Sequence, residues 1–170
     1  RTGIGLPAYY NDEVIIPALQ NRGLSLEDAR DYNIIGCVEP QKAGKTEGWH
    51  DAAFFNMCRP LELVFANGMD KGEIVGIPTG DVTQMKSFEE FFDAYKKQME
   101  YCISLLVNAD NAIDVAHAER CPLPFLSCMI DDCLKEGRSV PEGGAVYNFT
   151  GNQGFVIANM ADVLFAIRKL

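Results

Sequence analysis

An apolar stripe with helical spacing between Ser87 and His117 is the strongest pattern in the chain. Apolar side chains recur there every three or four residues, which places them on one face of an α-helix. Ser87 followed by Glu90 forms a capping box that predicts the start of this helix. Pro122 and Pro124 predict its end, because proline disrupts a helix interior. The stripe consists of Phe88, Phe91, Phe92, Tyr95, Met99, Cys102, Ile103, Leu106, Ala109 and Ile113.

Shorter helices are predicted before and after this one. Asn11 or Asp12 is suited to cap a helix that runs to about residue 20. Ser25, with Asp28 three residues later, forms a second capping box and predicts a short helix. Further helices are expected over residues 52–67, where Pro60 interrupts the pattern, over 126–136 and over 155–170.

Extended segments alternate with these helices. The apolar run 33–38 predicts one strand, and residues 145–149 predict another. The loose alternation of the second run suits a strand that is buried on both faces. Short strands separated by long helices predict the α/β class, as part of a barrel or of an open sheet. Three smaller features complete the pattern: a strand end at residues 6–10, a hairpin near 72–76 inside a loop over 69–86, and a turn at 151–154.

Composition and charge narrow the class of protein. The chain has 170 residues, of which 48% are hydrophobic and 23% charged, so one globular domain with its own core is expected. The net charge of −9 argues against binding to nucleic acid, because no basic stripe is present to neutralise phosphates. It argues equally against docking on an anionic membrane. No apolar run approaches the ~20 residues that a membrane span needs, and no signal-peptide pattern opens the chain.

The cysteines and the two ends of the chain bear on its setting. Six cysteines occur without a C-x-x-C pair, and the two histidines, His50 and His117, stand apart from most of them. A zinc site is therefore not expected, and we expect reduced thiols in a cytoplasmic protein. The chain begins at Arg1 and ends at Leu170 while a helical pattern continues. It is expected to be an internal piece of a longer protein.

The candidate chemistry begins with the stretch from Gly36 to Pro40, which holds a thiol and a carboxylate two residues apart. If the chain is extended there, Cys37 and Glu39 point to the same side, ~6.5 Å apart along the strand. Both side chains would then face one small molecule. The alternative is a buried cysteine beside a surface glutamate, because free cysteine usually behaves as a small apolar residue.

A second polar group follows in Trp49, His50 and Asp51. These residues predict a polar pocket with an aromatic wall, next to the thiol and the carboxylate. The alternative is purely structural: Trp49 packs, His50 bonds the backbone and Asp51 caps the next helix. For His50 the structural role is favoured. For Asp51 the cap and the place in the pocket are compatible. Catalysis by a cysteine nucleophile would pair Cys37 with His50 or His117, but no hydrolase signature surrounds the cysteine.

Several stretches together resemble the glycyl radical enzymes. Residues 32–41 and 48–56 are similar to the Cys-loop region of that family, and further similarity lies at 80–84, 117–124 and 144–151. The resemblance implies an α/β fold, namely part of a ten-stranded barrel made of two five-stranded parallel half-barrels. Residues 1–170 would then belong to the pyruvate formate-lyase-like catalytic barrel domain, in its C-terminal half-barrel, with the Cys loop projecting into the centre.

The resemblance is strongest to the cobalamin-independent dehydratases of glycerol and propane-1,2-diol. It implies that Cys37 becomes a thiyl radical that removes hydrogen from a hydroxyl-bearing carbon. Glu39 would be the general base on that carbon's hydroxyl, for which a raised pKa would suit it, and Asp51 would bind substrate hydroxyls. The alternatives are a lyase acting on choline (choline trimethylamine-lyase), isethionate or hydroxyproline, a non-catalytic homologue, and, more distantly, a cysteine hydrolase.

The resemblance also implies groups that this stretch does not supply. The glycyl radical would lie in a C-terminal segment absent from these residues and would be installed by a radical-SAM iron–sulfur activating enzyme. No cofactor and no metal is expected on the chain itself, which alone would be inactive. The expected setting is an anaerobic cytoplasm or a bacterial microcompartment, with a small diol as substrate and a homodimer as the parent's state.

Overall fold

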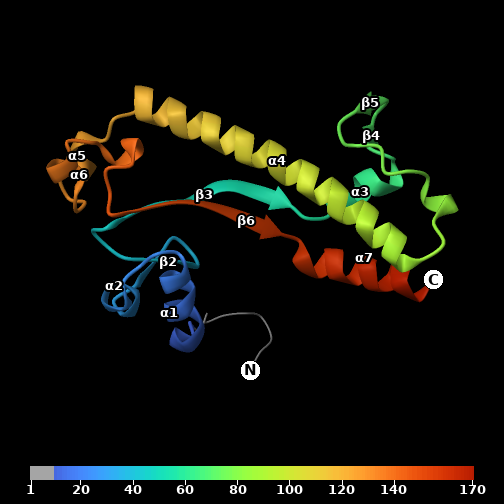
Figure 1. Ribbon diagram of the computed structural model, residues 1–170, viewed down its shortest axis with the longest axis horizontal. Coiled ribbons are helices and arrows are strands. Elements are labelled where there is room, and N and C mark those ends of the chain that lie inside the picture. The colour runs from blue at the N-terminus through green and yellow to red at the C-terminus, as the bar shows by residue number, and fades with distance from the viewer. Residues whose placement is uncertain (1–9) are drawn as a thin grey trace. The chain divides into compact units, whose positions relative to one another are not determined.

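The computed structural model describes residues 10–170, and the strand end expected at residues 6–9 lies outside them. Groups of helices and groups of strands follow one another along the chain (Figure 1). The α-helices are α1 Asp12–Asn21, α2 Leu26–Arg30, α3 Arg59–Phe65, α4 Phe88–Arg120, α5 Pro124–Ser127, α6 Cys133–Glu136 and α7 Ile157–Lys169. The strands are β1 Asn33–Ile35, β2 Glu39–Gln41, β3 Thr46–Asn56, β4 Met69–Asp70, β5 Glu73–Ile74 and β6 Tyr147–Phe155. Two 3₁₀ turns lie at Val82–Gln84 and Val140–Glu142.

The chain divides into two compact units. The first unit holds the described residues up to His50 together with Ala116–Thr150, and the second unit holds Asp51–Val115 and Gly151–Leu170. The strands pair as β1 with β2, β4 with β5, and β3 with β6. The first two pairs are antiparallel hairpins, and the second of them confirms the hairpin expected near residues 72–76.

Local capping signals explain where the helices of the first unit begin. The side chain of Asn11 accepts a hydrogen bond from the amide of Glu13 at 3.0 Å, and Ser25 Oγ accepts one from the amide of Asp28 at 3.0 Å. Both side chains satisfy amides that have no partner inside the helix. The two predicted starts are therefore confirmed. The helices pack on a small core whose buried members are Leu19, Leu24 and Ala29.

A buried carboxylate ties the first unit together. Asp28 is 7% exposed and accepts hydrogen bonds from Lys45 Nζ at 2.8 Å and from the hydroxyl of Tyr147 at 2.7 Å. The hydrogen bond from Lys45 has the largest effect in holding the pKa of Asp28 below its usual range, and the bond from Tyr147 acts in the same direction. Tyr147 also donates its amide to the carbonyl of Lys45 at 2.9 Å. These contacts fix the beginning of β6 beside the residue that precedes β3.

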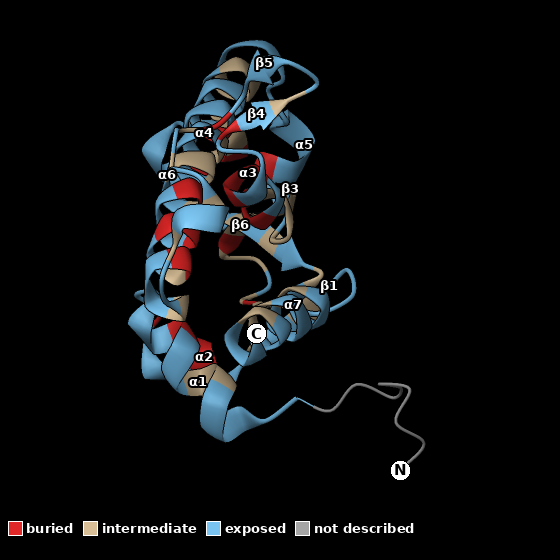
Figure 2. Cartoon of the chain, turned by 90° about the vertical axis from the view of Figure 1, so that its right-hand side faces the viewer, coloured by how far each residue is buried: buried red, intermediate tan, exposed pale blue. Residues whose placement is uncertain are grey.

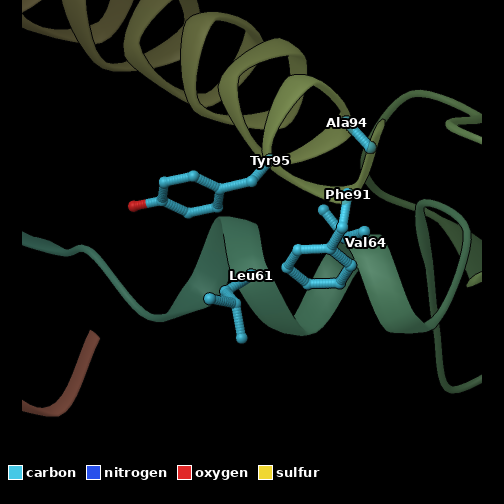
Figure 3. Close-up of a cluster of buried hydrophobic side chains, with 5 residues drawn as sticks. All are labelled: Leu61, Val64, Phe91, Ala94 and Tyr95. Carbon is cyan, nitrogen blue, oxygen red and sulfur yellow. The ribbon is translucent and has the colours of Figure 1, made fainter. Parts of the chain in front are cut away.

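The core of the second unit lies between α3 and α4. Figure 3 shows the side chains of α3 meeting those of α4 across this contact. Burial raises the pKa of Tyr95 to about 12, and its hydroxyl donates to the carbonyl of Met57 at 3.3 Å. A buried Gln98 accepts from the amide of Ile77 at 3.2 Å and so anchors the preceding loop to α4. The five core residues are Leu61, Val64, Phe91, Ala94 and Tyr95.

Two predicted segments are wrong, and both errors concern the β3–β6 pair. Residues 52–67 are not one helix, because β3 runs to Asn56 and α3 begins only at Arg59. Pro60 lies in the first turn of α3, where its missing amide has no bond to lose. The turn expected at 151–154 is instead part of β6. Strand pairing across about a hundred residues holds both segments extended, and no local pattern carries that information.

The helix predicted over 126–136 is two short helices. Asp132 has a φ of +72°, a left-handed conformation that interrupts the helical path before α6. Gly137, with a φ of +64°, ends α6 after residue 136, where the predicted helix over 126–136 also ends. The long helix is confirmed, with Ser87 Oγ accepting from the amide of Glu90 at 3.2 Å.

Burial along α4 is uneven. Figure 2 distinguishes its buried positions from its exposed ones. Phe91, Ala94 and Tyr95 are buried, whereas Ile103 and Ile113 of the predicted apolar stripe are more than 40% exposed in this chain. Within residues 10–170, no helix combines the length and the apolar character that crossing a bilayer requires.

Candidate functional site: the Cys loop

Cys37 lies at the tip of the β1–β2 hairpin. Ile35 is paired with Glu39 in the antiparallel register, which leaves residues 36–38 as the tip. Gly36 has a φ of +59°, a conformation that glycine adopts without strain, and the chain turns there. The strand expected to continue to residue 38 therefore ends at Ile35. The thiol of Cys37 is exposed at this turn and is not buried in a core.

The side chain of Glu39 folds back over the hairpin tip. Its Oε2 accepts hydrogen bonds from the amide of Cys37 at 2.9 Å and from the amide of Val38 at 2.8 Å. This carboxylate thus bonds the backbone of the loop, whereas an extended chain would place it beside the thiol along one strand. The extended backbone expected at Cys37 is wrong, because this residue lies in the turn that follows Gly36.

These hydrogen bonds determine the charge of the glutamate. The hydrogen bond from the amide of Val38 has the largest effect in lowering the pKa of Glu39. The bond from the amide of Cys37 and the charge of His50 lower it further. Amide donors stabilise the ionised form of a carboxyl group more than its neutral form. Burial acts in the opposite direction but does not prevail. The raised pKa expected for this residue is therefore wrong for this structure, in which Glu39 is held as a carboxylate.

His50 lies near enough to the carboxylate of Glu39 for its charge to lower the pKa of that group. Its Nε2 is 3.2 Å from Oε1 of Gln41, a side-chain partner that the expectation of a backbone bond did not include. Glu39 and Gln41 are two residues apart in β2 and project to one side of that strand. A β-carbon on Gly48 would lie 1.9 Å from His50 Nε2, so this glycine leaves the space that the ring occupies.

Trp49 packs against the end of α4. Its ring and that of His117 are arranged edge to face, with centroids 5.3 Å apart. His117 lies in the last turn of α4, the position expected for a side chain near helix carbonyls. Trp49 thus forms an aromatic contact in the first unit, as its packing alternative predicted.

Asp51 belongs to the second unit and lies in β3. Its Oδ1 accepts a hydrogen bond from Nε2 of Gln153 in β6. The expected role as a helix cap is wrong, because no helix begins at the following residue. Close by in the same strand pair, Phe54 and Phe155 meet edge to face with centroids 6.4 Å apart.

Two contributors to this site were missed from the sequence. The hydroxyl of Tyr10 donates to the carbonyl of Cys37 at 2.9 Å, and Gln41 holds His50. Tyr10 is 27 residues from its partner, and no spacing rule links the two. Gln41 could have been found from the sequence, because it is two residues from Glu39 in an extended segment and so projects to the same side.

The described residues contain no group of three or more His, Cys, Asp or Glu side chains that is arranged to hold a metal ion. All six cysteines are free thiols. Burial raises the pKa of the thiols of Cys102 in α4 and Cys133 in α6. The chemistry available at the loop is therefore that of a thiol, a carboxylate and an imidazole.

Known proteins share this sequence and fold. A structure concerning 1,2-propanediol dehydration in Roseburia inulinivorans is 70% identical, with a TM-score of 0.94 over 99% of this chain and 21% of that chain. The glycerol-bound form of the B12-independent glycerol dehydratase from Clostridium butyricum is 62% identical, with a TM-score of 0.93 over 98% of this chain and 21% of that chain. (2S)-3-sulfopropanediol dehydratase from Klebsiella oxytoca is 40% identical over 172 residues, which is 100% of this chain and 21% of the relative.

These matches settle the family and the fold class. The chain spans about a fifth of the length of the relatives it matches, 21% in each of these three cases. The expected fold class, an α/β portion of the barrel of glycyl radical enzymes, is confirmed. The family described as pyruvate formate lyase-like matches residues 1–170. The chain belongs to this pyruvate formate lyase-like family of glycyl radical enzymes.

Proposed function

We propose that this chain is the Cys-loop segment of a glycyl radical carbon–oxygen lyase that dehydrates a small 1,2-diol, glycerol or propane-1,2-diol, to an aldehyde. One observation carries the substrate class. The chain is 70% and 62% identical to the structures concerned with propanediol dehydration and glycerol dehydratase, but 40% identical to the sulfopropanediol dehydratase. Among these three proteins, the identity is higher for the two whose named substrate is an uncharged diol.

Cys37 is the hydrogen-transferring residue in this proposal. A glycyl radical in another part of the full-length protein would remove the hydrogen atom from the thiol of Cys37. The sulfur radical then takes a hydrogen atom from a hydroxyl-bearing carbon of the diol, so a C–H bond breaks and the S–H bond forms again. Exposure of Cys37 at a hairpin tip supports this role, because the sulfur must touch a substrate.

Glu39 is the general base for the same carbon. It takes the proton of that carbon's hydroxyl, which makes the neighbouring C–O bond labile, and this bond breaks to release the second hydroxyl. That hydroxyl leaves as water with the proton that the base held. The remaining carbon radical takes the hydrogen atom back from Cys37, so aldehyde and water account for all atoms of the diol. The lowered pKa of Glu39 keeps this residue ionised before the reaction, as a base must be, and makes it a weaker base than the raised pKa expected from the sequence would.

Asp51 is proposed to accept hydrogen bonds from the substrate hydroxyls. One of its oxygens is engaged by Gln153, which orients the carboxylate within the β3–β6 pair. Further parts are proposed on the family resemblance alone. They are a radical-SAM iron–sulfur activating enzyme, a homodimeric parent, and an anaerobic cytoplasm or microcompartment.

The test uses the full-length protein, activated without oxygen by its activating enzyme. Aldehyde formation is measured with glycerol, propane-1,2-diol and (2S)-3-sulfopropanediol, and electron paramagnetic resonance measures the radical. We expect turnover of an uncharged diol and none in the C37A variant, which keeps the glycyl radical signal. A protein that carries the radical and turns over only the sulfonated substrate would refute the substrate class. A protein that forms no radical would be a non-catalytic homologue.

A further inference from the structure

The peptide groups on both sides of Cys37 are held by side chains. Its amide donates to Glu39 Oε2 at 2.9 Å, and its carbonyl accepts from the hydroxyl of Tyr10 at 2.9 Å. Exposed loop tips are usually the most mobile part of a fold. Two hydrogen bonds from separate segments of the chain therefore act against the motion expected of this position.

Gly36 makes the approach of the carboxylate feasible. A β-carbon at this position would lie 2.8 Å from Oε2 of Glu39, closer than real β-carbons approach another atom. Its φ of +59° also suits glycine and strains other residues. Oε2 bonds the amide of Val38 as well, at 2.8 Å. The carboxylate thus holds two successive amides of the tip.

Tyr10 connects the other side of Cys37 to a helix. It directly precedes Asn11, whose side chain caps α1 by accepting from the amide of Glu13 at 3.0 Å. Helix α1 is anchored in turn by Leu19 in the core of the first unit. The hydroxyl of Tyr10 therefore fixes the carbonyl of Cys37 relative to a packed element.

We infer that Tyr10 and Glu39 form a backbone clamp that aims the thiol of Cys37, and that Tyr10 is a positioning residue of the reaction. This inference rests on the proposed function of Cys37 in hydrogen transfer. A hydrogen atom moves between sulfur and carbon only at contact distance, and a misplacement of about 1 Å can lower a rate about 100-fold. A clamp on the two peptide groups of one residue restricts where its side chain points.

The first experiment compares two tyrosine variants of the activated full-length protein. Y10F removes the hydroxyl that holds Cys37, and Y32F removes a hydroxyl that donates to Asp12 in α1 at 2.8 Å. We expect Y10F to lower kcat roughly 5- to 50-fold, with KM for the diol and the radical yield unchanged. Y32F should keep kcat within about twofold of the unaltered protein, because its bond is not to the loop. Equal kcat values in Y10F and Y32F would overturn the inference.

The second experiment measures the clamp without any turnover. Hydrogen exchange of the amides of Cys37 and Val38 is followed in the full-length protein before activation. E39A should speed both at least about tenfold, whereas E39Q should keep them protected, since its amide oxygen still accepts. Y10F should speed exchange at the tip and Y32F should not.

The two experiments separate the clamp from the proposed function. If exchange changes as expected but the activated protein dehydrates no diol, the clamp stands and the proposed function falls. If E39A or Y10F leaves the exchange of both amides unchanged, the clamp is refuted, whatever the protein turns over.

Discussion

The ring of His50 lies where the side chain of any residue other than glycine at position 48 would be. A β-carbon on Gly48 would come within 1.9 Å of His50 Nε2, and that nitrogen is 3.2 Å from Oε1 of Gln41. The charge of His50 contributes to the lowered pKa of Glu39. A single glycine in β3 thus permits a histidine to act on the carboxylate of the Cys loop.

We expect G48A to reproduce the effect of H50Q. The added methyl group displaces the ring, and either change removes a cation that favours the ionised form of Glu39. Its pKa then rises, so the acid limb of the pH profile of kcat/KM for the diol moves to higher pH. Near and below the ordinary glutamate pKa of about 4.3 we expect kcat/KM to fall roughly 3- to 10-fold in each variant, with no change at neutral pH. The double variant should be no worse than either single one, because both remove one contact.

G154A is the matched control for the comparison of G48A, H50Q and the double variant. Gly154 is also a strand residue without a positive φ. A β-carbon there would meet only the flexible side chain of Met57, whose sulfur would lie 3.0 Å away. It should leave the acid limb in place. Additive losses in the G48A/H50Q double variant would separate the glycine from the histidine and contradict this reading of the site.

The carboxylate of Asp28 should make stability depend on pH. Its pKa is lowered in the folded protein by Lys45 and Tyr147, so the unfolded chain binds its proton more readily. The stabilisation is then complete above the ordinary aspartate pKa of about 4 and is lost as the pH falls through the lower folded value. D28N should lower the melting temperature at neutral pH by several degrees.

The difference in melting temperature between D28N and the unaltered protein should become smaller in acid. As the pH falls below about 4, the unaltered protein loses the contribution of Asp28 and approaches D28N. Thermal unfolding followed by circular dichroism between pH 3 and pH 7 measures both curves. D31N serves as a control, because the side chain of Asp31 is 79% exposed. A deficit of D28N that stays constant across this range would show that packing, not charge, stabilises this position.

Helix starts were predictable from the sequence because their causes are local. Asn11, Ser25 and Ser87 each accept from an amide two or three residues ahead, and this needs no other part of the chain. Strands β3 and β6 depend on each other instead. The sequence predicts a helix for residues 52–56 of β3 and a turn for residues 151–154 of β6, because the pairing of these strands is set by contacts about a hundred residues apart.

The candidate site shows the same division. Cys37 and Glu39 were singled out by their spacing, and they do lie together on one hairpin. The extended backbone expected at Cys37 is wrong, because the chain turns at Gly36 and the carboxylate of Glu39 bonds the amides of the tip. Tyr10 has no sequence signal at all. Residues that hold a loop from a distant segment are known only from coordinates.

The core between α3 and α4 should be sensitive to loss of volume. Val64 is fully buried, and its side chain packs with Leu61 and Phe91. We expect V64A to lower the free energy of unfolding by about 1–3 kcal/mol and F91A by about 3–5 kcal/mol. V115A in α4 removes the same atoms from a residue that is 58% exposed. It should change the free energy of unfolding by less than about 0.5 kcal/mol. Equal losses in V64A and V115A, measured in urea, would place the core elsewhere.

Asp51 and Gln153 provide the sharpest test of substrate recognition. Gln153 donates to Oδ1 of Asp51, and a carboxylate held in this way keeps acceptor capacity for a substrate hydroxyl. D51N should lower kcat/KM for glycerol about 10- to 100-fold, since charged acceptors bind hydroxyls more strongly than neutral ones. Q153L leaves the charge but removes its donor, so we expect a smaller loss, about 3- to 10-fold, expressed mainly in KM.

The control for these two variants is D93N, the same carboxylate-to-amide change on α4, where Asp93 is 62% exposed in its side chain and pairs with Lys96. It should leave KM unchanged. The order of the losses is the informative result, because a carboxylate that contacts substrate must matter more than the amide that orients it. If D51N turned over glycerol as well as the unaltered protein did, the carboxylate would not bind the diol. A loss in Q153L larger than that in D51N would instead assign the substrate contact to the glutamine.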